Sequence, residues 1–152
     1  MLLTELLTPD RLVVPLAARD KQSAIAELVR HLVERGGGGD AAQVLASVEE
    51  RESVLSTGIG LGVAIPHARS SAVRELVVVG GVAAAAIPYD SIDGEPVRLF
   101  FLIVGPEASA GLHVKILSRI ARLVRRDTVR QQLVEAKTPD ELYRFLVDAE
   151  AR

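Results

Sequence analysis

Two apolar stretches decide the fold class: LVVVGGVAAAAI at residues 76–87 and VRLFFLIV at residues 97–104. Continuous runs of this kind are typical of central sheet strands that are covered on both faces. The segment 90–96 between them contains Asp93-Gly94 and is expected to turn. Shorter apolar segments at 12–14, ended by Pro15, and at 63–65 predict two further strands.

Helical patterns lie on the N-terminal side of these strands. Asp20 is a good N-cap for a helix that the glycine run at 36–39 is expected to end. Asp40 is expected to cap a second helix, with Gln43 in the capping-box position, and that helix is expected to run out near Arg51. The apolar positions of the first helix recur at helical spacing: Ile25, Leu28, Val29, Leu32 and Val33.

The C-terminal third is also predicted to be helical. One apolar stripe consists of Leu112, Ile116, Ile120 and Leu123. Asp127 is expected to cap a short helix, and Thr138-Pro139-Asp140-Glu141 has the pattern of a capping box with proline at the first helical position. Helices at both ends around a central group of strands predict an α/β sandwich, with one domain spanning 1–152.

Composition excludes several classes of protein. The chain has 152 residues, with 49% hydrophobic residues, 18 basic against 20 acidic side chains and 3% aromatics. This charge balance and the scarcity of aromatic stacking surfaces argue against nucleic acid as a partner. The absence of cysteine excludes disulfides, thiolate metal sites and a cysteine nucleophile.

Neither a secretory signal nor a membrane span is expected. The N-terminus, MLLTE at residues 1–5, lacks a basic region and carries an acidic residue early. The longest apolar run, 76–87, falls short of the ~20 residues that span a bilayer. We therefore expect a soluble cytoplasmic protein with no direct membrane insertion.

Residues 56–67 form a glycine-rich segment that runs into Pro66-His67. It does not fit a dinucleotide fingerprint, because Gly58, Gly60 and Gly62 alternate and a strand-like run follows them. A Gly-Lys-Ser/Thr sequence for a P-loop is missing as well. The pattern instead favours a loop whose backbone N–H groups approach an anion and lead to a histidine held by a constrained backbone.

His67 is the candidate nucleophile, since a neutral imidazole beside an anion cradle suggests phosphoryl transfer through a phosphohistidine. The alternative is a strand-end histidine that is hydrogen-bonded to a backbone carbonyl. His113, near the start of a predicted helix, is either a partner for such a site or a partly buried helix-start residue. Arg51 either neutralises a bound phosphoryl group or acts only as a helix-terminal cation.

Two other features are expected to be less informative. His31 lies among helical residues and is expected at the surface, and three scattered histidines make a metal site unexpected. A basic stripe at helical spacing either docks an acidic partner or forms a solvated face. This stripe consists of Lys115, Arg119, Arg122 and Arg126.

Together these motifs closely resemble the enzyme IIA proteins of the bacterial phosphotransferase system, in the fructose/mannitol and nitrogen-regulatory class (PTS EIIA type 2). The resemblance rests on the segments 51–52, 56–60 and 62–69, and continues through 93–97 to His113 and 138–142. It covers nearly the whole chain. Departures from the family pattern are small, such as Val114 where leucine is common.

The resemblance implies an α/β sandwich with a mixed sheet, in which His67 accepts a phosphoryl group from HPr or its nitrogen-branch counterpart. His113 would be the supporting histidine and Arg51 the cation near the phosphoryl group. The loop around that group would consist of Thr57, Gly58, Gly60 and Gly62. No cofactor is implied.

Three functions stay open at this point. The chain resembles slightly more the standalone nitrogen-regulatory branch, which signals to target proteins by its phosphorylation state. The alternative is a sugar-uptake phosphocarrier that passes its phosphoryl group to a cysteine-bearing IIB protein. A third interpretation is an unphosphorylated ligand-binding domain in which His67 is structural.

Overall fold

The structure, a computed structural model, describes residues 1–151 and shows one six-stranded mixed sheet in the order β1-β5-β6-β3-β2, with β4 also paired to β6. The strands are β1 (Leu12–Leu16), β2 (Gly58–Gly60), β3 (Val63–Ala64), β4 (His67–Arg69), β5 (Val77–Ile87) and β6 (Val97–Gly105). The longest pair, β5 and β6, is antiparallel, whereas β1 is parallel to β5.

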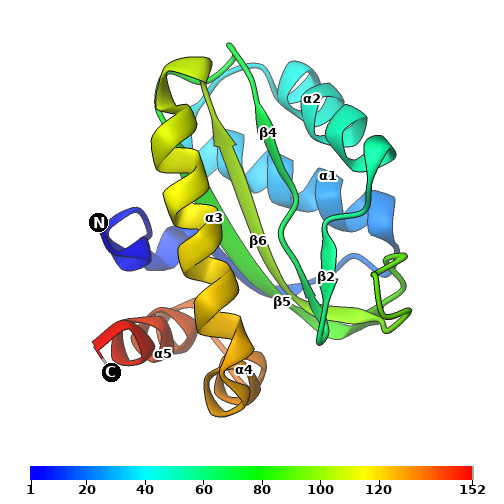
Figure 1. The fold of residues 1–152 in the computed structure, drawn as a ribbon, viewed down its shortest axis with the longest axis vertical. Helices are drawn as coiled ribbons and strands as arrows, with labels where there is room; N and C mark the ends of the chain where they lie inside the picture. The colour runs from blue at the N-terminus through cyan, green and yellow to red at the C-terminus, as the bar shows by residue number, and fades with distance from the viewer. Residues whose placement is uncertain (152) are drawn as a thin grey trace.

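Helices cover both faces of the sheet (Figure 1). On one face lie α1 (Lys21–His31) and α2 (Ala41–Val54), and on the other lie α3 (Ala110–Arg125), α4 (Asp127–Val134) and α5 (Pro139–Ala151). Short turns of 3-10 or π-helix complete the chain at Leu3–Glu5, Pro9–Arg11, Leu32–Gly37 and Glu107–Ser109. The fold is therefore the predicted α/β sandwich with a mixed central sheet.

Neighbouring residues of β6 enter different cores because side chains alternate across a strand. Phe100 and Leu102 pack with α1 and α2, whereas Phe101 and Ile103 pack with the α3–α5 layer. All four side chains are at most 1% exposed. Both faces of the central strands are buried, which explains why their sequences are continuously apolar.

β6 also positions the segment that carries His67. β3 and β4 both pair with β6 in parallel, with Val63 opposite Leu99 and His67 opposite Ile103. Between the two short strands the chain passes Pro66, whose carbonyl accepts a hydrogen bond from the Ile103 amide at 3.1 Å. The backbone of His67 is thus held by a central strand.

Several predicted boundaries were wrong. β1 continues through Pro15 to Leu16, which is possible because β1 is an edge strand and a proline there loses no required N–H partner. α2 extends past Arg51 to Val54. Residues 58–60, expected as a loop, form β2 and pair antiparallel with β3. For β1 the pairing partner is β5, which is distant in sequence and invisible to local patterns, whereas β2 pairs with the neighbouring β3.

The helix starts were predicted better than the ends. Asp20 accepts from the Ser23 amide at 2.8 Å, and the Asp40 carboxylate accepts from the Ala42 amide at 2.9 Å, as N-caps do. Asp127 is different: it is the first residue of α4, and its carboxylate accepts from Arg130 at 2.8 Å instead of capping the helix.

Candidate functional site

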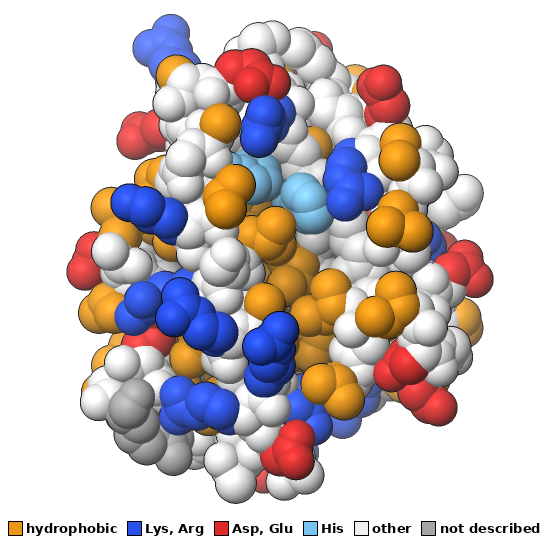
Figure 2. Space-filling model, viewed as in Figure 1, with side chains coloured by type: hydrophobic (Ala, Val, Ile, Leu, Met, Phe, Trp, Pro, Cys, Tyr) orange, Lys and Arg blue, Asp and Glu red, His pale blue; other side chains and the backbone are white. Residues whose placement is uncertain are grey.

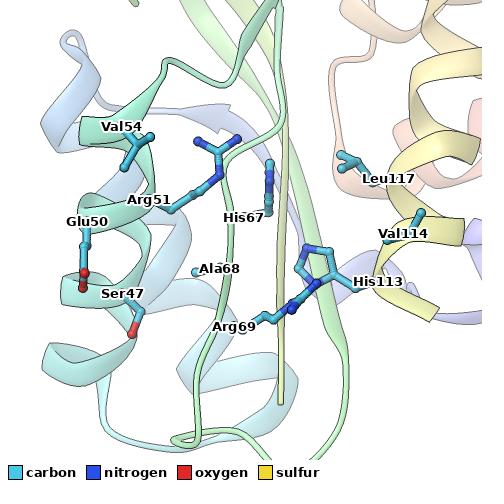
Figure 3. A pocket seen from close by; sticks show the side chains of 10 residues that line it. All are labelled: Ser47, Glu50, Arg51, Val54, His67, Ala68, Arg69, His113, Val114 and Leu117. Atoms are coloured by element: carbon cyan, nitrogen blue, oxygen red, sulfur yellow. The ribbon is translucent and has the colours of Figure 1, made fainter. Parts of the chain in front are cut away.

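A pocket of about 570 Å³ lies where α2, β4 and the start of α3 meet. Figure 3 shows His67 at its centre, with Arg51 reaching in from α2 and His113 from α3. The remaining lining residues are Ser47, Glu50, Val54, Ala68, Arg69, Val114 and Leu117. The structure therefore brings together three of the predicted site residues: Arg51, His67 and His113.

The two histidines are neighbours although they are far apart in the sequence. Their ring centroids are 5.5 Å apart and the rings are inclined by 68°. Figure 2 shows histidine side chains side by side at the surface, next to Lys or Arg side chains and above a hollow of hydrophobic ones. His67 is half-buried, whereas His113 is only 5% exposed.

The hydrogen bond of His67 defines which ring nitrogen is available. Nδ1 of His67 lies 2.7 Å from the carbonyl oxygen of Ile65. A carbonyl oxygen can only accept, so Nδ1 carries the hydrogen and Nε2 of a neutral ring keeps its lone pair. The alternative interpretation, a strand-end histidine hydrogen-bonded to a backbone carbonyl, is thus right about this hydrogen bond. The same bond leaves Nε2 unprotonated in a half-buried ring that lines the pocket.

Burial favours the neutral form of both imidazoles. It is the main cause that lowers the pKa of His67, and the charges of Arg51 and Arg69 lower it further, against the Ile65 hydrogen bond and the charge of Glu52. Burial also lowers the pKa of His113 to about 4, with smaller contributions from His67 and Arg69. Two neutral imidazoles therefore face the pocket at neutral pH.

Nδ1 of His113 is buried and has no hydrogen-bond partner among residues 1–151. Buried polar atoms are nearly always paired, so an unpaired ring nitrogen in a ligand-sized pocket calls for an explanation. A group that enters the pocket and hydrogen-bonds this ring would supply one.

Two guanidinium groups add positive charge to the pocket. Arg51 donates through Nη1 to the Leu55 carbonyl at 3.0 Å, and Arg69 donates through Nη1 to Glu107 at 3.2 Å. Each of these bonds uses one nitrogen of a fork that can hold oxyanions in a bidentate manner. Sequence reasoning assigned no role to Arg69. Side chains alternate along a strand, so residues 67 and 69 of β4 lie on the same face, and this alternation is the sequence signal that could have identified Arg69.

Thr57 and the glycines lie elsewhere. None of Thr57, Gly58, Gly60 and Gly62 lines the pocket. The Gly58 amide donates to Ser56 Oγ at 3.1 Å, and the amide of Leu61 donates to Asp93 at 2.9 Å. Gly60 and Gly62 have φ values of 91° and 77°, which explains glycine at both positions. The segment forms a tight hairpin instead of an open cradle.

Thr57 connects this hairpin to α2 through a buried carboxylate. Its amide and its hydroxyl donate to Glu52 at 2.9 and 2.6 Å, and Lys21 of α1 pairs with the same carboxylate at 3.0 Å. Glu52 is 8% exposed and directly follows Arg51. Thr57 therefore supports the end of α2, where Arg51 begins its reach into the pocket.

The remaining candidates lie outside the pocket. Nε2 of His31 is 2.6 Å from the Asp10 carbonyl, in an exposed setting. Three of the four residues of the basic stripe, Arg119, Arg122 and Arg126, line a different cavity, beside α5, and Lys115 does not. Within residues 1–151 there is no group of three His, Cys, Asp or Glu side chains that could hold a metal ion, and no helix that is long and apolar enough to cross a membrane.

The lowered pKa of His113 predicts a pH dependence of stability. Its ordinary value of 6.5 in the unfolded chain lies above the value of about 4 in the fold. The His113 ring therefore binds a proton more tightly in the unfolded chain than in the fold. As a result, the free energy of unfolding decreases as the pH falls from about 6.5 toward 4. At 1.36 kcal/mol per unit, the loss from this group is roughly 3 kcal/mol. Urea unfolding at pH 7 and pH 4.5 measures the change, and His113→Gln should make it smaller. An unchanged pH dependence in that variant would contradict the assignment.

These features define an α/β domain that presents a neutral histidine pair between two arginines, and comparison with known proteins agrees with it. The model of the family "Phosphoenolpyruvate-dependent sugar phosphotransferase system, EIIA 2" matches residues 5–149. The chain belongs to this family, whose members are components of a phosphotransfer system.

Relatives come from two branches. The chain is 32% identical over 148 residues to a nitrogen regulatory protein of Pseudomonas aeruginosa, covering 97% of this chain and 96% of that protein. It is 35% identical over 142 residues to the fructose-specific EIIABC component of Bacillus subtilis, which is 93% of this chain but only 22% of that protein's length. The crystal structure of IIA-Ntr from Neisseria meningitidis superimposes with a TM-score of 0.87 at 28% identity, covering 94% of this chain and 97% of that one.

Proposed function

We propose that this protein accepts a phosphoryl group on Nε2 of His67 from the phosphohistidine of HPr or its nitrogen-branch counterpart. The observation that carries the proposal is the hydrogen bond from His67 Nδ1 to the Ile65 carbonyl at 2.7 Å, because it leaves Nε2 as the free base of a ring that lines an open pocket. Membership of the EIIA type 2 family supports phosphoryl transfer as the chemistry.

The transfer is an in-line exchange of one phosphorus–nitrogen bond for another. The Nε2 lone pair of His67 attacks phosphorus while the bond to the donor's imidazole nitrogen breaks, and the electron pair of that bond returns to the donor ring. The phosphorylated His67 ring becomes cationic, and the Ile65 carbonyl that accepts from Nδ1 stabilises that charge. The pocket contributes positioning and charge stabilisation to the reaction.

The surrounding side chains suit the three phosphoryl oxygens. Arg51 and Arg69 supply guanidinium groups on two sides of His67 (Figure 3). His113, kept neutral by its lowered pKa, hydrogen-bonds a phosphoryl oxygen through an N–H without placing a second cation in the pocket. This contact would also fix the tautomer of the His113 ring.

One experiment tests the proposal directly. The protein is incubated with phosphoenolpyruvate, enzyme I and HPr, and its intact mass is measured before and after mild acid. We expect the addition of one acid-labile phosphoryl group. A protein that stays unmodified under conditions that phosphorylate a known IIA protein would refute the proposal.

Regulation by phosphorylation state is the first role we propose for the phosphorylated protein, acting in the cytoplasm. It is supported by the match with nitrogen regulatory proteins over nearly their whole length. Sugar uptake through a cysteine-bearing IIB protein is the second candidate, favoured by the similarity to the fructose-specific component. The mannitol IIA of Escherichia coli, which shares this fold, has been solved in complex with phosphorylated IIB. Transfer of the label to an added IIB protein and then to sugar would favour uptake.

Arg69 gives a further prediction for this site. Arg69→Gln removes a charge that lowers the pKa of both His67 and His113, so both should titrate at higher pH in NMR spectra. The phosphorylated protein should also lose its label about tenfold faster, since a charge-assisted hydrogen bond to the phosphoryl group is missing. Arg30→Gln, at an exposed position of α1, is the matched control. Unchanged titration of both histidines would argue against the role of Arg69.

A further inference from the structure

A second basic cavity lies between α3 and α5. Its volume is about 290 Å³, and its lining consists of Arg119, Arg122, Leu123, Arg126, Ala149 and Glu150. It shares no residue with the pocket of His67. Figure 2 shows a gathering of Lys and Arg side chains over the lower half of α3, apart from the histidines.

Arg119 is held in place by a buried acceptor. Its Nε donates to Oε2 of Glu150 at 2.7 Å, and the side chain of Glu150 is 2% exposed. The same carboxylate also accepts from the amides of Leu3 and Thr4 at 2.7 and 2.8 Å and from the Thr4 hydroxyl at 2.7 Å. The hydrogen-bonding capacity of Glu150 is thereby filled, and the terminal nitrogens of Arg119 have no acceptor within residues 1–151.

The other two arginines have capacity to spare. Arg126 donates through Nη1 alone, to the Ala149 carbonyl at 3.3 Å. Arg122 is exposed and makes no hydrogen bond or ion pair with any other residue of the described range 1–151. Three guanidinium groups and one carboxylate give the lining a charge of 3 − 1 = +2, in a chain whose net charge is −2. An anion bound among them would relieve their mutual repulsion.

We propose that this cavity binds a small multivalent anion of the phosphate class, such as the diphosphate group of a metabolite. Guanidinium forks match phosphate oxygens in a bidentate manner, and two of the three arginines are oriented in advance by acceptors from α5. The volume lies at the lower end of the range for ligand pockets, which favours a compact ligand. The proposal is independent of the role of His67.

Thermal unfolding and NMR titration of the full chain with inorganic pyrophosphate test this proposal. We expect a rise in melting temperature that sodium chloride of equal ionic strength does not reproduce, because an anion that binds only the folded state stabilises it. Arg122→Gln should weaken pyrophosphate binding about tenfold or more, as expected when a charge-assisted hydrogen bond is lost. Arg125→Gln is the matched control: it is exposed on the same helix but does not line the cavity.

The pocket of His67 is also positively charged, so the Arg51→Gln variant is used to distinguish pyrophosphate binding in that pocket from binding in the cavity between α3 and α5. The proposal requires that Arg51→Gln retains the binding and that the Nε–Hε signals of Arg119 and Arg126 move on titration. Binding that survives Arg122→Gln but is lost in Arg51→Gln would overturn it. The absence of any specific melting-temperature rise would overturn it as well, and would turn attention to an acidic protein surface as the partner of this stripe.

Discussion

Replacing His67 with asparagine is expected to abolish phosphorylation while leaving the fold intact. The asparagine amide can donate to the Ile65 carbonyl as Nδ1 of His67 does at 2.7 Å, but it has no nucleophile at the place of Nε2. Phosphoryl incorporation from the carrier, read by intact mass, should fall to background. That loss corresponds to at least about a thousandfold in rate, as found when a covalent nucleophile is removed.

His31→Gln is the matched control for this experiment. His31 is the histidine outside the pocket, and glutamine retains a polar group near Nε2, which lies 2.6 Å from the Asp10 carbonyl. This variant should be phosphorylated like the wild type. If the His67→Asn protein still carries an acid-labile phosphoryl group, the acceptor lies elsewhere and the proposed function is wrong in its central residue.

Removing the carboxylate of Glu52 is expected to produce the largest loss of stability among these variants. Glu52 accepts from the Thr57 amide and hydroxyl and pairs with Lys21 at 3.0 Å. Glu52→Ala leaves a buried N–H and a partly buried ammonium group without their acceptor, and it leaves the Thr57 hydroxyl with only the Tyr89 hydroxyl, 3.2 Å away. Breaking a buried pair in this way costs about 3–5 kcal/mol, which corresponds to roughly 10 °C in melting temperature at this chain length.

Glu49→Ala provides the comparison on the same helix, because Glu49 is exposed and should change the free energy of unfolding by less than about 0.5 kcal/mol. Thr57→Val is a milder test of the same contacts, since it removes the hydroxyl and keeps the amide. Urea unfolding measures all three variants. A loss of only about 1 kcal/mol in Glu52→Ala would show that water replaces the carboxylate at little cost.

Glu52 also explains why Thr57 and the glycines that follow it matter to the site although none of them lines the pocket. The sequence of the glycine-rich segment suggests an anion cradle, because glycines with free amides often form one. In the structure the Gly58 amide donates to Ser56, the neighbouring Leu61 amide donates to Asp93, and the Thr57 hydroxyl donates to Glu52. Local composition does not reveal which acceptor an amide finds, so this part of the site could not be predicted from the sequence.

Local patterns by themselves determined the apolar central strands, the helix starts at Asp20 and Asp40, and the Pro66-His67 step of the candidate site. These features depend on interactions within a few residues or on the alternation of side chains along one strand, and both can be recognised in the sequence itself. Only the tertiary structure decided that Arg51, His67 and His113 share one pocket, that Arg69 joins them, and that Arg119 meets Glu150 beside α5. Such meetings depend on the pairing of β4 with β6 and on the packing of α2, α3 and α5 against the two faces of the sheet. That pairing and packing arise from the burial of side chains that are distant in sequence, which no local pattern records.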